Sequence, residues 1–337
     1  MSDYEKANNY ENALRSLGSI KKRDDYGLFQ MTYYGDYGFD EFLKVGARDQ
    51  DELEAIIEVL VFKDMAGIEA EVKAKINDVG AGCTVFTYRN AAGEVLYGRN
   101  YDFPIYSPPL QLTTRPQNGY ASVSTSSLLY LEYGEGVLPS GVNLDSIGTL
   151  AAPYIPADGV NEKGVAMAIL SVAEVNAPYS EDKISINTTA AIRLVLDKAA
   201  NTYEAIELIK QYNIFFSLDI YCHYLIADKS GRSVVVEFWD NDVKVVETPI
   251  ASNFIASSKQ KIAQGNAIER YDKVKEVLDS SGGILDQGQA IDLLMDVGAR
   301  STEVGLGLQW SVIYNLSTLE GVIFASGNAD NLIDFKL

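Results

Sequence analysis

The amino-acid pattern changes from helical to strand periodicity at Cys83. Ahead of it, apolar residues recur at helical spacing over residues 53–61. From the cysteine onward, residues 84–88 read as a strand, and a turn at 90–93 leads into a second strand from Val95. The chain is therefore predicted to start a hairpin at a cysteine, after a helical segment whose apolar faces must be buried elsewhere.

Strands and helices are predicted to follow this hairpin in separate groups. Antiparallel strands with segregated helix pairs favour an α+β fold, with two sheets stacked face to face under outer helices, over a doubly wound parallel sheet. No linker rich in Pro, Gly or Ser interrupts residues 83–337, so these are predicted as one domain with residues 1–82 packed against it. The further predicted strands are 165–172, 220–227, 233–239, 242–246, 309–315 and 321–325, and the predicted helices are 188–199, 202–212 after Asn201-x-x-Glu204, 267–278, and 287–297 after Asp286-x-x-Gln289.

The charge balance bears on partners and location. Acidic side chains (47) outnumber Lys and Arg (28), which gives a net charge of −19. This charge repels nucleic-acid phosphates and anionic lipids, and no apolar run reaches the roughly 18 residues of a membrane span, so neither partner is expected. The N-terminus is polar with no visible signal peptide, and two cysteines make no disulfide framework. A reducing, cytoplasmic location is expected.

Several common kinds of site are absent from the sequence. A single histidine, His223, excludes His-rich zinc sites, and two distant cysteines exclude Cys-rich ones. Phosphate-binding loops, dinucleotide-binding glycine motifs and the serine-hydrolase elbow are missing too, so no metal or organic cofactor is expected. His223 lies in an apolar strand and is predicted to be packed. Its neighbour Cys222 points to the opposite face of that strand and is a poor partner for proton transfer.

Three chemistry-bearing residues lie on the first hairpin. Cys83 opens its first strand, Arg99 closes the second, and Asp102 follows just beyond, so the cysteine and the arginine are predicted to lie side by side across the ladder. A guanidinium favours the thiolate, and a carboxylate could fix an ammonium group or the guanidinium itself. The alternative is a buried, inert cysteine beside a surface ion pair.

The residue before the cysteine, Gly82, has no Cβ, so its carbonyl can be held in a strained conformation and approached closely. If the Gly82–Cys83 bond were cut, Cys83 would gain a free α-amine beside its own thiol. Such an amine has a pKa of about 7.7–8.0, which suits a general base at neutral pH without any histidine.

At these residues the sequence resembles the N-terminal-nucleophile linear amide C–N hydrolases, which include bile salt hydrolase, penicillin V acylase, acid ceramidase and N-acylethanolamine acid amidase. The resemblance runs in family order from residue 83 to about 325 and implies a four-layer αββα fold with self-cleavage before Cys83. The matching blocks are Cys83-Thr84, Gly98-Arg99-Asn100-x-Asp102, Asp158-Gly159-x-Asn161-Glu162-Lys163-Gly164, Asp228–Glu237, Ser252-Asn253 and Ile268-Glu269-Arg270-Tyr271.

Carried over position by position, the resemblance implies roles for the residues around the thiol. Cys83 would be the nucleophile and, through its freed amine, the general base. Arg99 would lie against the thiol, and Asp102 would orient the amine. Asn253 would donate a hydrogen bond to the oxyanion, and Arg270 would support the surroundings of the nucleophile.

Two departures from the family pattern affect the substrate. Ser171 stands at a position that lends a further oxyanion donor, where bile salt hydrolases and penicillin acylases have asparagine. A backbone N–H could still serve there, but the pocket differs. The leading 82 residues resemble instead the long prosegment of the acid ceramidase branch, which stays bound after cleavage as a small subunit. The chain's own cleaved segment is thus an expected partner.

The resulting hypothesis is an amidase that hydrolyses the linear amide of an N-acylated small molecule through a Cys83 thioester. Two alternatives remain open at this point: acyl transfer from the same thioester to an amine, and an unprocessed binding protein on the same scaffold. The sequence leaves the acyl chain and the amine undetermined among bile salts, penicillin V, acyl homoserine lactones and fatty amides. The oligomeric state, a homo-oligomer included, is also open.

Overall fold

The computed structural model describes residues 3–62, 82–134, 138–259, 262–299 and 307–337. Of the predicted leading segment, residues 1–2 and 63–81 therefore lie outside the described residues. Within the described ranges, no helix is long and apolar enough to cross a membrane.

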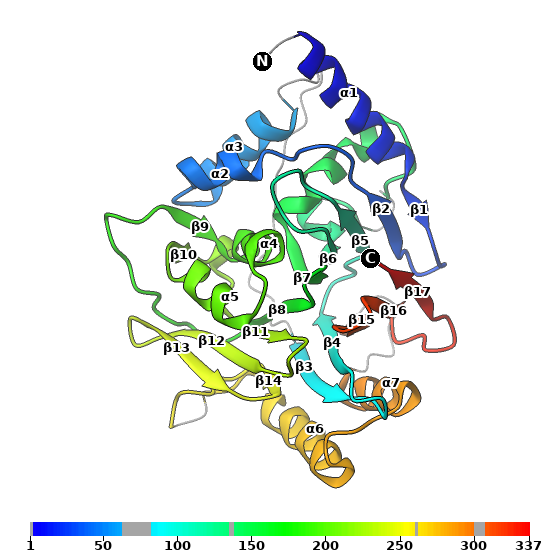
Figure 1. Cartoon of the computed structure of the whole chain (residues 1–337), viewed down its shortest axis with the longest axis vertical. Helices are drawn as coiled ribbons and strands as arrows, with labels where there is room; N and C mark the ends of the chain where they lie inside the picture. Colours follow the sequence, from blue (N-terminus) through cyan, green and yellow to red (C-terminus); the bar gives the residue numbers. More distant parts are fainter. Residues whose placement is uncertain (1–2, 63–81, 135–137, 260–261, 300–306) are drawn as a thin grey trace.

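Two large sheets form the centre of the molecule (Figure 1). All their strand pairs are antiparallel except β2 with β5. In spatial order the first sheet contains β1 (Lys21–Lys22), β2 (Phe29–Thr32), β5 (Pro109–Thr114), β6 (Ser122–Ser127), β7 (Pro156–Asn161), β8 (Val165–Ser171), β11 (Cys222–Asp228), β12 (Ser233–Trp239) and β13 (Asp242–Glu247). The second contains β14 (Ile250–Ser252), β3 (Gly82–Arg89), β4 (Val95–Phe103), β15 (Gly307–Asn315), β16 (Glu320–Ala325) and β17 (Ile333–Lys336).

Helices cover the outer faces of both sheets. The helix pair α4–α5 lies on the first sheet, and α6–α7 lies on the second, at the bottom of Figure 1. The helices are α1 (Asp3–Gly18), α2 (Phe39–Val45), α3 (Gln50–Phe62), α4 (Thr188–Lys198), α5 (Thr202–Ile209), α6 (Ala267–Ser281) and α7 (Gln287–Val297), with short 3-10 helices η1 (Leu128–Leu131), η2 (Leu144–Tyr154) and η3 (Ser217–Asp219) and a small parallel pair of β9 (Ser185–Asn187) with β10 (Asn213–Phe215).

The layers follow from where the apolar side chains point. Between the sheets, the small residues Ala166 and Ala168 of β8 share one core with Val85 and Tyr97 of the hairpin. Separate apolar clusters fill the space under the helices on each outer side. Burial of apolar area is the main favourable contribution to folding, so three cores hold four layers together. The predicted α+β fold of two antiparallel sheets with outer helices is confirmed.

The leading segment is built into this fold by both its strands and its helices. Strand β2 pairs with β5 in parallel and so extends the first sheet. The rings of Phe39 and Phe42 pack on Tyr154, with ring centroids 5.8 and 5.6 Å apart. Tyr37 donates a 2.6 Å hydrogen bond to Asp197 of α4. Main-chain pairing and aromatic packing thus join residues 3–62 to the rest of the chain.

Most predicted elements are present, with small differences at their ends. Helix α7 has the predicted bounds, and Asp286 with Gln289 forms the full capping box. Asn201 caps α5, which ends at Ile209 rather than at residue 212 because the chain turns there into β10. The sequence reasoning missed the polar strands β5, β6 and β7.

Candidate active site

The hairpin β3–β4 brings Cys83 and Arg99 together, but not directly opposite each other. Cys83 pairs with Tyr101 in the ladder, and Arg99 pairs with Val85, so the expectation of a side-by-side pair is corrected to a diagonal one on the same sheet face. The Arg99 side chain is long enough to span the offset, and its Nη2 lies 3.9 Å from Cys83 Sγ. Nη2 also donates a 3.1 Å hydrogen bond to the Ile169 carbonyl of β8.

Arg99 is held by a buried carboxylate that the sequence reasoning gave no role. Its Nη1 lies 2.9 Å from Asp158 Oδ2 on β7, and both side chains are 0% exposed. The same carboxylate accepts hydrogen bonds from Trp310 Nε1 at 3.0 Å and from the Tyr314 hydroxyl at 2.6 Å. Asp158 therefore neutralises the guanidinium and fixes its position between the sheets. The sequence signal that could have identified this role is the position of Asp158 within one of the blocks that match the family pattern.

Asp102 lies directly opposite Gly82 in the ladder. Its Oδ1 accepts a 3.0 Å hydrogen bond from the Ala299 backbone, and its Oδ2 is 3.5 Å from Arg270 Nη1. No described residue makes a hydrogen bond to that Oδ2. A Cβ on Gly82 would stand 3.3 Å from it, so this oxygen faces the glycine backbone. Burial raises the pKa of Asp102 to about 6.

This raised pKa predicts how the stability of the uncleaved chain depends on pH. The folded pKa of about 6 exceeds the ordinary value of 3.8, so the folded chain binds more protons than the unfolded chain between these values. The free energy of unfolding should therefore fall as pH rises from about 4 to about 6, by roughly 3 kcal/mol for this group. Urea titrations of Cys83→Ala, which lacks the thiol expected to make the cut, and of Cys83→Ala with Asp102→Asn would isolate the effect. Equal pH slopes in the two variants would contradict it.

Asn253 and Arg270 converge on the backbone of the cysteine. Asn253 Oδ1 accepts hydrogen bonds from the Cys83 N–H and from Arg270 Nη2, both at 2.7 Å. Arg270 Nη1 donates to the Cys83 carbonyl at 2.8 Å. Asn253 Nδ2 donates to Ser171, to its carbonyl at 2.8 Å and to its hydroxyl at 3.0 Å. The structure thus brings all the predicted site residues together, with the amide of Asn253 bridging Cys83 and Ser171.

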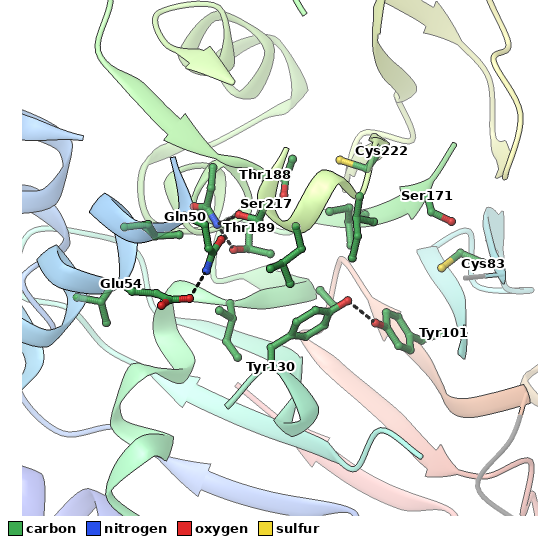
Figure 2. Close-up of a pocket in the computed structure, with 18 residues that line it drawn as sticks. Gln50, Glu54, Cys83, Tyr101, Tyr130, Ser171, Thr188, Thr189, Ser217 and Cys222 are labelled. Carbon is green, nitrogen blue, oxygen red and sulfur yellow. Dashed lines mark hydrogen bonds between the residues drawn. The ribbon is translucent and has the colours of Figure 1, made fainter. Parts of the chain in front are cut away.

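The thiol lies at one end of a pocket whose lining is mainly apolar (Figure 2). The empty volume is ≈ 870 Å³, counting the part open to solvent. The hydroxyls of Tyr101 and Tyr130, which also line this pocket, lie 3.4 Å apart. Burial raises the pKa of the Cys83 thiol, and the charge of Arg99 opposes this rise. An apolar group bound here would place its attached carbonyl beside the thiol.

His223 is buried in β11, as predicted, with Nδ1 3.2 Å from Glu237 Oε1. Cys222 lines the pocket and faces the other side of the strand, where burial raises the pKa of its thiol. This histidine is therefore a packed residue without a thiol partner. Across the described ranges, no group of three or more His, Cys, Asp or Glu is placed to hold a metal ion.

Comparison with known proteins agrees with this geometry. The family described as linear amide C–N hydrolases, choloylglycine hydrolase family, matches residues 83–277, which is more than half of the chain and begins at Cys83 itself. No curated protein sequence matches the chain.

Solved structures with the same fold include two enzymes. A mutant of the conjugated bile acid hydrolase from Clostridium perfringens superposes with a TM-score of 0.54 at 18% identity, over 76% of this chain and 92% of that one. Penicillin V acylase from Agrobacterium tumefaciens gives 0.52 at 17% identity, over 72% of this chain and 83% of that one. These likenesses show the fold, in which two antiparallel sheets are stacked between outer helices. With the family match, they show that the chain belongs to the linear amide C–N hydrolases of the choloylglycine hydrolase family.

Proposed function

We propose that the protein is a self-processing amidase that hydrolyses the linear amide of an N-acylated small molecule through a thioester on Cys83. The observation that carries this proposal is the Oδ2 of Asp102, which accepts no hydrogen bond from the described residues and faces Gly82 next to a thiol at the end of an apolar pocket. A carboxylate so placed can hold the α-ammonium group that cleavage before Cys83 would create. The start of the family match at Cys83 supports the same cleavage point.

Self-cleavage would use the same thiol. Cys83 Sγ attacks the Gly82 carbonyl carbon, and the peptide C–N bond breaks. The nitrogen of Cys83 takes up the proton that the thiol has lost, which leaves a thioester between Gly82 and the Cys83 sulfur. Water then hydrolyses this thioester to the Gly82 carboxylate and the free thiol. In the uncleaved chain, Asn253 and Arg270 fix the backbone on the far side of the scissile bond through the Cys83 N–H and carbonyl.

In the mature protein, the α-amine of Cys83 would act as the base. It takes the thiol proton, and Asp102 holds the resulting ammonium while Arg99 stabilises the thiolate. The thiolate attacks the amide carbonyl, and Asn253 with a backbone N–H near Ser171 binds the oxyanion, each donor contributing about 3–4 kcal/mol. The leaving amine takes the proton from the ammonium. Water, deprotonated by the same amine, then releases the acid from the thioester.

Asn253 would need to redirect one N–H for this role, because its Nδ2 donates to Ser171 in the uncleaved chain. Cleavage would change its surroundings, since the Cys83 nitrogen that Asn253 Oδ1 now binds becomes an amine with new hydrogen-bonding capacity. We therefore assign Asn253 and Ser171 together to the oxyanion site.

The segment 1–82 is proposed to stay bound after cleavage as a small subunit. Its described part supplies β2 to the first sheet and packs Phe39 and Phe42 in the outer core. Removing it would expose the edge of β5 and the apolar residues beneath. Residues 83–337 would then be the catalytic subunit.

Alkylation tests the proposal that Cys83 does the chemistry. Treating the mature protein with iodoacetamide should abolish hydrolysis across a panel of N-acyl amides, with one label on Cys83, because the thiolate is the nucleophile. Peptide mass mapping locates the label, and Cys222, the second buried cysteine of the pocket, is the internal control. Hydrolysis that persists after complete labelling of Cys83 would rule the mechanism out. Products formed with and without an added amine would separate hydrolysis from acyl transfer.

A further inference from the structure

The loop that begins with Asn253 is tied to the first sheet by a buried glutamate. Asn253 directly follows β14 of the second sheet, and residues 254–258 continue the loop. Glu237 of β12, on the first sheet, accepts hydrogen bonds from the backbone N–H groups of Ala256 at 2.6 Å and Ser257 at 2.9 Å. One side chain of β12 thus spans to the loop after β14, and the two strands lie near each other in Figure 1.

The hydrogen bonds of this loop fall into two groups. The first two backbone N–H groups after Asn253 donate to the carbonyls of Ser252 and Ile262, at 2.8 and 2.9 Å, and so set the shape of the loop itself. The next two donate to Glu237 and fix the loop against the first sheet. Without this carboxylate, two neighbouring N–H groups would lose their acceptors, and the loop would be held less firmly.

The chain's single histidine orients this carboxylate. Glu237 is 0% exposed, and His223 Nδ1 lies 3.2 Å from its Oε1. Burial raises the pKa of Glu237, but hydrogen bonds from His223 and Ser257 outweigh it and hold that pKa below its ordinary value. The side chain is therefore an ionised acceptor, and Nδ1 must carry the hydrogen that it accepts.

We propose that Glu237 is a positioning residue for Asn253, and that His223 orients Glu237 for this task. The amide of Asn253 must serve both the nitrogen of Cys83 and the oxyanion, which tolerates little movement of its backbone. A carboxylate that binds the loop three and four residues further on restricts that movement. This inference rests on the proposed function, because it takes Asn253 to bind the oxyanion.

Glu237→Gln tests the proposal with little change of size. The amide oxygen can accept from one N–H of the loop, but the NH2 group would face the other. In chains that have split before Cys83, kcat for an N-acyl amide should fall about 10–100-fold, because a small displacement of an oxyanion donor is costly. KM should change little, because other residues line the apolar pocket.

A pair of variants at His223 distinguishes positioning from packing. His223→Leu removes the donor to Glu237 and should lower kcat, by less than Glu237→Gln does. His223→Asn places an amide nitrogen near the position of Nδ1 and should recover most of the lost kcat. A site that only needs filling would prefer leucine to asparagine, because an apolar side chain is the more favourable one to bury. The order of the two variants in kcat should therefore be opposite to the order expected from packing.

Asp228 provides the matched control. It is also a buried carboxylate that accepts backbone N–H groups, from Thr202 at 2.8 Å and Ser230 at 2.9 Å. It lies at the other end of β11 from His223. Asp228→Asn should lower the urea midpoint, as Glu237→Gln does, but should leave kcat and KM unchanged.

The results separate a failure of the inference from a failure of the proposed function. An unchanged kcat in Glu237→Gln, an equal loss of kcat in Asp228→Asn, or a change in KM alone would overturn the inference and leave the amidase proposal standing. A split wild-type chain that hydrolyses no N-acyl amide would overturn the proposed function, and the inference with it.

Two outcomes of Glu237→Gln need a second reading. If the variant unfolds cooperatively in urea but no longer splits, the inference is supported, because Asn253 Oδ1 also holds the Cys83 N–H. If it does not fold, the His223 variants decide. A kcat for leucine equal to or above that for asparagine would then overturn the inference.

Discussion

Replacing Cys83 with alanine should give a single uncleaved chain of 36.9 kDa with no amidase activity. The wild-type protein should instead separate into residues 1–82 and 83–337 when denatured. One sulfur atom is proposed both to cut the Gly82–Cys83 bond and to carry the acyl group, so its loss removes both reactions. Intact mass after denaturation, with an assay on the same sample, measures both.

The other cysteine is the matched control for this experiment. Cys222 is also buried and also lines the pocket, but it lies on β11, away from the scissile bond. Cys222→Ala should therefore still split before Cys83. A single full-length species in an active wild-type sample would contradict self-processing, and splitting of Cys83→Ala would show that another group makes the cut.

The sequence alone predicted those parts of the fold and the site that depend on residues close together in the chain. Strand periodicity placed Cys83 and Arg99 on one hairpin, and capping residues such as Asp286 and Gln289 marked a helix start that the structure confirms. Such signals are readable because they depend on a few neighbouring residues. The expectation that Arg99 lies directly opposite Cys83 was wrong by two residues. The register of a hairpin depends on its turn and on the core that it faces.

The parts that could not be predicted depend on contacts between distant segments. Strand β6 has an unusually polar sequence for a buried strand, yet it is fully buried because Arg193 of α4 donates to the hydroxyls of Ser122 and Ser124. Asp158 had no assigned role because its partner Arg99 lies on the facing sheet. Glu237 had no assigned role either, since its contact with the loop after Asn253 follows only from how the two sheets face each other.

The buried pair of Arg99 with Asp158 should have the largest effect on stability. Asp158→Ala should lower the free energy of unfolding by about 3–5 kcal/mol, because it leaves an uncompensated buried guanidinium. In the Cys83→Ala background the chain is expected to stay in one piece, so urea unfolding can compare the variants. The exposed pair of Lys275 with Asp279 is the control, and Asp279→Ala should change stability little.

The double change Arg99→Met with Asp158→Leu separates the two roles of this ion pair. Two apolar side chains of similar size remove both charges, so most of the stability lost in Asp158→Ala should return. Activity should not return when Cys83 is present, because the thiolate would have lost the cation 3.9 Å away that stabilises it. Recovery of both stability and activity would mean that Arg99 serves only to hold the two sheets together. Recovery of stability alone would assign the guanidinium to the chemistry at Cys83.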